Sequence, residues 1–175
     1  YSLLCLRDLY DHGQGVLRAL PDLTEARRYL GRMVGRDTQD LNQAGIVRAA
    51  IESLAENLTD GVLTPFWALC LFGLPGLVLV KAASTLDSMV GYRSPRYRHF
   101  GWASARADDW IHWVPARLSA LVIGCSALLL RLHPVAALRS AWRHHGRLES
   151  PNSGWSEASY AGALQVQLLG PIRKR

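Results

Sequence analysis

Cysteine is scarce in this chain, and the common catalytic signatures are missing. The three cysteines among 175 residues, Cys5, Cys70 and Cys125, stand far apart with no CxxC pair. We therefore expect neither a zinc site nor a disulfide framework. The signatures of phosphate loops, dinucleotide folds, zinc proteases and serine hydrolases (GxxxxGKS/T, GxGxxG, HExxH and GxSxG) are also absent. A use of ATP therefore cannot be derived from a motif.

Charged residues are few, and long stretches have almost none. They make up 19% of the chain against 49% hydrophobic residues, and no charged side chain occurs from residue 61 to 80. About 20 apolar residues are enough for a helix to cross a bilayer core. We predict an all-α integral membrane protein of one domain, residues 1–175, with about two transmembrane helices at residues 61–80 and 111–130 and amphipathic flanking helices.

The second apolar stretch contains one charge, Arg117. An arginine at the centre of a membrane helix costs about 2.5–3.5 kcal/mol on insertion scales. Because Arg117 lies near the start of the stretch, two interpretations stay open. It can extend to the membrane interface, or it can face a partner carboxylate.

The net charge of +6 and the isoelectric point near 9.7 suit anionic lipid or phosphorylated ligands. No basic helix with interleaved stacking aromatics is present, so nucleic acid is not an expected partner. Residues 131–147 contain four arginines and no acid, which predicts a cytoplasmic loop. With two spans, the helix before residue 61 lies on the same side of the membrane.

A row of carboxylates precedes the first apolar stretch. Glu52, Glu56 and Asp60 follow one another at four-residue steps, with Asn57 beside them. Like charges at this spacing destabilise a helix by about 0.2–0.5 kcal/mol per pair, which indicates a cation nearby. Hard oxygen ligands suit Mg²⁺, so Glu56 and Asp60 are candidate ligands. The alternative is a solvated helix face without a ligand.

A second polar group follows the same stretch. Lys81, Ser84 and Asp87 share one helical face. Lys81 and Asp87 can bind a ligand, or they can form a simple ion pair at the membrane boundary. Arg106 and Asp108 in the next segment have the same two interpretations, since exposed pairs contribute only about 0–1 kcal/mol.

Capping patterns predict where three helices begin. Asp22, Asp40 and Ser156 are the predicted N-caps. The helix after Asp22 is expected to run to Val34, and Gly13 is expected to interrupt the first helix.

Three long blocks of the sequence resemble the CobD/CbiB family of cobalamin biosynthesis, the adenosylcobinamide-phosphate synthases. They read AAIESLAENLTDGV, KAASTLDSMVGYRSPRYRHFGWASARADD and SPNSGWSEASYAGALQVQLLGP, and they occur in the family's order. Against this family the chain resembles a truncated member that lacks N- and C-terminal parts. Ser84 stands where relatives usually have asparagine.

The resemblance implies an ATP-dependent acid–amine ligase in the cell inner membrane, multi-pass, with its polar site on the cytoplasmic side. The enzyme would join adenosylcobyric acid to aminopropanol or its phosphate, with ATP and Mg²⁺ as cofactors. Other implied partners are membrane lipid and further cobalamin-pathway enzymes. The implied catalytic residues are Glu52, Glu56, Asp60, Lys81 and Asp87. The implied substrate- and nucleotide-binding residues are Asn57, Ser84, Tyr92, Arg93, Arg106, Asp108, Asn152, Trp155 and Glu157.

Two alternatives remain at this point. A non-catalytic membrane signalling relative of the AmpE type would keep the helical frame but would not need the acidic and LDSMVGY segments. A plain membrane scaffold would need none of them. Amide synthesis needs a base for the proton of the amine, and the sequence does not say which carboxylate serves.

Overall fold

The computed structural model describes residues 4–90, 101–148 and 150–168, and this part of the chain is helical with no β-strand. The all-α prediction is confirmed. In chain order the elements are α1 (Leu6–Ala19), α2 (Leu23–Leu30), α3 (Gln43–Leu58), the π-helix η1 (Thr59–Leu63), α4 (Thr64–Val90), α5 (Trp102–Leu129), α6 (Pro134–His144), the 3₁₀-helix η2 (His145–Arg147) and α7 (Ser153–Leu164).

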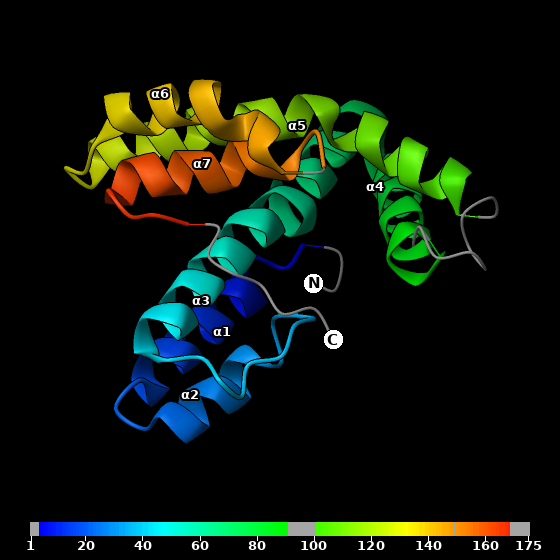
Figure 1. The fold of residues 1–175 in the computed structure, drawn as a ribbon. Coiled ribbons are helices and arrows are strands. Elements are labelled where there is room, and N and C mark those ends of the chain that lie inside the picture. Colours follow the sequence, from blue (N-terminus) through cyan, green and yellow to red (C-terminus); the bar gives the residue numbers. More distant parts are fainter. Residues whose placement is uncertain (1–3, 91–100, 149, 169–175) are drawn as a thin grey trace.

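The helices form two groups joined by α3. At one end α1, α2 and α3 pack against one another, and at the other end α5, α6 and α7 form a layer (Figure 1). Helix α3 also contacts α7, and α4 contacts α5 beside the start of this layer. The C-terminal part of α3 and η1 therefore lies where the two groups meet, which is where the predicted site residues converge.

The first group surrounds a small apolar core. Leu30 and Ile46 are completely buried within it. Asp22 caps α2 as predicted, because its side chain accepts hydrogen bonds from the backbone of the first turn. Helix α2 ends at Leu30 rather than Val34, so this expectation was wrong. Helix α1 continues through Gly13 without the expected interruption.

The start of α3 differs from the expectation by two residues. Asn42, not Asp40, is its N-cap, and the Asn42 side chain accepts a hydrogen bond from the Gly45 amide at 2.8 Å. The α7 N-cap is Asn152 rather than Ser156. Asn42 is a short polar residue of the same capping class as Asp40. Asn152 makes no side-chain capping hydrogen bond, and the Ser150 hydroxyl instead accepts hydrogen bonds from the backbone amides of Asn152 and Ser153.

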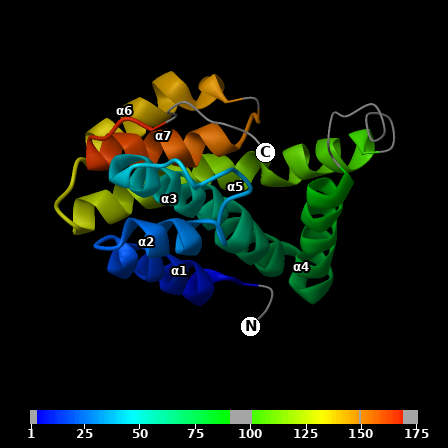
Figure 2. The same cartoon turned by 60° about the horizontal axis from the view of Figure 1, so that its bottom comes forward.

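The helix of the carboxylate row continues into the apolar stretch with two irregularities. It widens into the π-helix η1 at Thr59–Leu63 and then breaks at Gly73, whose φ is 64°. A positive φ is strained for residues with a side chain, which explains the glycine. Figure 2 shows the two limbs of α4 running in different directions. The predicted span at residues 61–80 is therefore not one uninterrupted helix.

Two helical segments, Gln43–Met89 and Trp102–Leu129, are long and apolar enough to cross a membrane. This confirms the prediction of two such helices. Several large apolar side chains on them face outward, including Phe72, Leu74, Leu79 and Leu121, each more than half exposed. Outward apolar side chains on long apolar helices are the arrangement expected in contact with lipid.

The contact between α6 and α7 depends on small residues. Gly154, Ala158 and Gly162 follow one another at four-residue steps on α7 and are buried. A Cβ atom at Gly162 would lie 2.7 Å from the carbonyl carbon of Ala136. The two backbones thus approach as closely as helices do in small-xxx-small packing.

Candidate functional site

Four side chains from three elements meet at the junction of η1, α4 and α5. Asp60 Oδ1 lies 3.4 Å from His112 Nε2, and His112 Nδ1 lies 3.3 Å from Asp108 Oδ2. On the far side of this group, Ser84 Oγ donates a hydrogen bond to Asp108 Oδ1 at 2.7 Å. Asp60, His112, Asp108 and Ser84 therefore form a continuous polar chain, which we call the Asp–His–Asp chain.

The exposure of this chain changes along its length. The side chain of His112 is only 2% exposed, whereas that of Asp60 is 47% exposed. Asp60 is thus the end that a ligand can reach, and His112 lies behind it. An imidazole between two carboxylates can hold a proton and orient its neighbours, as general acid–base sites require.

His112 was not among the residues predicted from the sequence. It lies in an apolar stretch, where a single histidine is more often part of the packing than of a site. A signal was present: Asp108 precedes it by four residues, which places the two on one helix face. The same spacing lets His112 Nδ1 reach the Asp108 carbonyl oxygen at 2.9 Å.

The carboxylate row does not act as a uniform face. Glu52 forms a largely buried ion pair with Arg36 from the loop before α3. Glu56 is exposed, and Asn57 donates a hydrogen bond to the carbonyl oxygen of Ser53 at 2.8 Å. The cation expected near the row is therefore Arg36, which neutralises the charge of Glu52 but not of the other carboxylates in the row.

Glu157 on α7 belongs to the same region. It is buried, with 8% of the residue exposed. Burial, together with the nearby carboxylates of Glu56 and Glu52, raises the pKa of Glu157 from 4.5 to about 8, while Arg36 lowers it. Glu157 is therefore a carboxyl group that holds its proton near neutral pH.

The other predicted residues lie in different surroundings. No ion pair joins Lys81 to Asp87 in the described part of the chain, and the buried Asp87 Oδ1 has no hydrogen-bond partner there. Arg106 pairs with Asp109 at 3.8 Å rather than with Asp108, so the expected pair was wrong by one residue. Tyr92 and Arg93 lie outside the described residues.

Asn152 and Trp155 connect α7 to α5. The Asn152 side chain donates a hydrogen bond to the Asp109 carbonyl oxygen at 2.9 Å. The Trp155 ring stacks on His145 with a centroid separation of 4.2 Å. Both residues thus contribute to packing beside the Asp–His–Asp chain.

Arg117 has an aromatic partner. Its guanidinium carbon lies 3.8 Å from the centroid of the Trp113 ring. A guanidinium N–H of Arg117 also donates a hydrogen bond to the Trp113 carbonyl oxygen at 2.6 Å. No carboxylate pairs with Arg117 in the described part of the chain. The negative face of a tryptophan ring stabilises a cation held over it, and this contact suits an arginine near a membrane interface.

The fit of the expected Mg²⁺ can be judged from the oxygen donors. No group of three metal-ligating side chains comes together within the described residues. Mg²⁺ in nucleotide-using enzymes is often held by one or two carboxylates, with phosphates and water in the other positions. The exposed Glu56 and the half-exposed Asp60 suit that mode, and they do not suit a closed metal cage.

The fold and the site define a helical protein with two membrane-length helices and a carboxylate–histidine group at their junction. Among known protein families, the model of the family described as "CobD/Cbib protein" matches residues 1–174 of the chain. The chain belongs to this family. No solved structure matches the chain.

Relatives with curated names agree with this placement. "Cobalamin biosynthesis protein CobD" of Rhodobacter capsulatus is 46% identical over 98% of this chain and 54% of its own length. The protein of the same name from Rhizobium meliloti is 48% identical over 96% of the chain and 53% of its own length. "Cobalamin biosynthesis protein CbiB" of Salmonella typhi is 47% identical over 98% and 54%. The chain therefore spans about half the length of the curated relatives it matches.

Proposed function

We propose that this chain is part of a cobalamin-biosynthetic ligase that joins adenosylcobyric acid to aminopropanol or its phosphate with ATP. Membership of the CobD/CbiB family and the names of the relatives support a role in this pathway. The proposed location is the inner membrane, multi-pass, with the polar site at the cytoplasmic face. The acid-free basic segment at residues 131–147 supports a cytoplasmic position for the end of α5 that it follows, since positive loops stay cytoplasmic.

The proposed reaction has two steps. ATP converts the carboxylate of the corrinoid into an acyl phosphate and releases ADP. The amine then displaces phosphate, and its nitrogen loses one proton as the amide forms. Such a reaction needs cations that bind phosphates, a group that accepts the proton, and exclusion of water.

The observation that carries the proposal is the Asp–His–Asp chain. It joins Asp60 of the first family-like sequence block to Asp108 of the second block. The Asp60 end of the chain is accessible. In this proposal Asp60 takes up the proton, while Asp108 and Ser84 fix the ring of His112 behind it. His112 is a positioning residue because it is buried behind Asp60.

Phosphate binding and the metal complete the proposed site. Lys81, Arg93 and Arg106 are the proposed cations for phosphate groups. Of the two predicted Mg²⁺ ligands, Glu56 would hold the metal, because Asp60 serves as the base in this proposal. Bound Mg²⁺ would neutralise charge on the nucleotide phosphates. Glu157 is proposed to act beside Glu56 as a protonated carboxyl that can donate a hydrogen bond.

The test is amide formation by the full-length protein in membranes. Asp60→Asn should lower turnover by about 10²-fold or more, the range that a general base contributes. Asp11→Asn is the matched control, because Asp11 is an exposed aspartate that pairs with Arg7 on the surface of α1. Wild-type turnover in Asp60→Asn would remove the site assignment. No amide product from the wild-type protein with acid, amine and MgATP would remove the function.

A further inference from the structure

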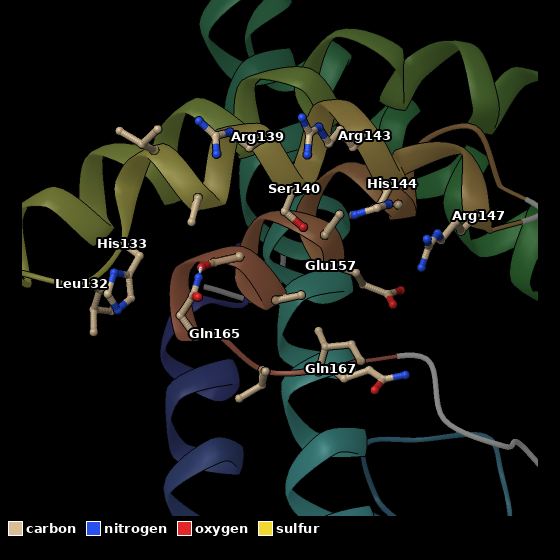
Figure 3. A pocket seen from close by; sticks show the side chains of 18 of the residues that line it. Leu132, His133, Arg139, Ser140, Arg143, His144, Arg147, Glu157, Gln165 and Gln167 are labelled. Atoms are coloured by element: carbon tan, nitrogen blue, oxygen red, sulfur yellow. Dashed lines mark hydrogen bonds between the residues drawn. The ribbon is translucent and has the colours of Figure 1, made fainter.

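A second polar concavity lies away from the Asp–His–Asp chain, between α6, η2, α7 and the extended residues 165–168. It has a volume of about 830 Å³. Sites for small ligands commonly measure about 300–1,000 Å³, so this groove is large enough for one. Figure 3 shows its lining, with Arg139, Arg143 and Arg147 on the α6 side and Glu157 on the α7 side. We call it the α6–α7 groove.

The α6 side of the groove is strongly basic. Arg139, Arg143 and Arg147 follow one another at four-residue steps, and His144 lies among them. All three arginines are exposed, and within the described residues none has an ion pair with an acid. Helix α6 and η2 contain no acidic residue. Like charges at this spacing disfavour the helix, so an anion in the groove would relieve the repulsion.

The residue types indicate which anion fits. Arginine presents several N–H donors in a planar fork that matches the oxygens of a phosphate group. The groove adds the hydroxyl of Ser140 and the amides of Gln165 and Gln167, which are neutral hydrogen-bonding groups (Figure 3). A row of three arginines with neutral donors, facing the single buried acid Glu157, is suited to a ligand with several phosphate oxygens.

We propose that the α6–α7 groove binds a phosphate-bearing ligand, with Arg139, Arg143 and Arg147 contacting its phosphate oxygens. This site is separate from the phosphate-binding residues proposed for the reaction, so it does not depend on that function. A soluble polyphosphate compound and the headgroup of an anionic lipid share the same chemistry. The two sources are distinguished by the arms of the experiment.

The experiment uses the purified full-length protein in neutral detergent. In the first arm, calorimetry measures binding of inorganic tripolyphosphate at two salt concentrations. In the second arm, thermal unfolding is followed with added phosphatidylglycerol and, for comparison, phosphatidylcholine. The variants are R139Q/R143Q and, independently, R147Q. The control is R7Q/R18Q, which removes two exposed arginines from α1.

We expect the wild-type protein to bind one of the two anionic probes, and R139Q/R143Q to weaken that binding by about ten-fold or more, because each charge-assisted hydrogen bond contributes on that order. R147Q should weaken it as well, and the control should match the wild-type protein. Binding of tripolyphosphate identifies a soluble ligand, and stabilisation by phosphatidylglycerol alone identifies a lipid. Equal binding by wild-type protein and both groove variants in both arms overturns the proposal, as does a wild-type protein that responds to neither probe.

Discussion

Replacing Gly162 by alanine should push α6 and α7 apart. A Cβ atom at this position would lie 2.7 Å from the carbonyl carbon of Ala136 and 2.7 Å from the Cβ of Ser140. Carbon atoms attract each other best at about 3.5–4.0 Å, so the separation would have to grow by about 1 Å. The atoms of Ala136 belong to the helix backbone, and they cannot rotate away as a long side chain can.

Two opposing effects set the size of the change. Overpacking of a close contact costs about 1–3 kcal/mol, and the high end applies where backbone must move. Alanine also favours the helix over glycine by about 0.8–1 kcal/mol. We therefore expect Gly162→Ala to lower the free energy of unfolding by about 2 kcal/mol, the difference between the high end of the overpacking cost and the gain in helix propensity.

The assay is thermal unfolding of the full-length protein in one detergent at one protein concentration. Gly146→Ala is the matched control, because a Cβ atom there would meet nothing within 4 Å. Gly146→Ala should unfold at the wild-type temperature, and Gly162→Ala several degrees lower. If Gly162→Ala unfolds at or above the wild-type temperature, helix propensity dominates and α6 and α7 are not in backbone contact.

Two further predictions concern the membrane and pH. Cys70 and Cys125 face outward on the two membrane-length helices. In intact membranes a bulky water-soluble maleimide should therefore leave both unlabelled, and it should label both once the protein is unfolded in SDS. Free labelling before unfolding would contradict the spans. Folding raises the pKa of Glu157 from 4.5 to about 8. Between these two pKa values the folded state binds more protons than the unfolded state, so the free energy of unfolding falls as the pH rises from one to the other. Glu157→Gln cannot ionise and should gain stability relative to wild-type protein between pH 5.5 and 8.5, measured by thermal unfolding, whereas a constant difference would contradict the shift.

Much of the fold followed from local patterns in the sequence. The charge-free run at residues 61–80 and the apolar stretch at 111–130 predicted the two long helices, because membrane-length apolar segments have few alternatives. Asp22 predicted the start of α2 from its capping pattern. The one-domain interpretation of residues 1–175 stays a prediction.

The parts that failed depend on tertiary structure or on single backbone conformations. Gly73 lies in an apolar run where a glycine is unremarkable, and only the structure reveals its positive φ. Helix α2 ends four residues early, with Gly31 as its C-cap, although Met33 and Val34 still pack against the core of the first group. Cap choice between Asp40 and Asn42 is a difference of a few tenths of a kcal/mol, which propensity does not resolve.

The candidate site was predicted as a list of residues but not as an arrangement. Asp60, Ser84 and Asp108 were each singled out, and the structure brings them together. What links them is His112, which was not predicted from the sequence. Arg106 illustrates the opposite case, since an exposed arginine near two neighbouring aspartates can pair with either, and local geometry selected Asp109.

The π-helix η1 explains why one row of acids serves different purposes. A π-turn adds a residue to a helical turn, and Asp60 lies in the π-helix one turn beyond Glu56. Glu52 remains on the side of Arg36, whereas Asp60 meets His112 on α5. The repulsion expected from three aligned carboxylates is thereby divided between an arginine and a histidine. Because π-turns occur frequently at functional sites, this irregularity is a further reason to look for the chemistry at Asp60 rather than at Glu52.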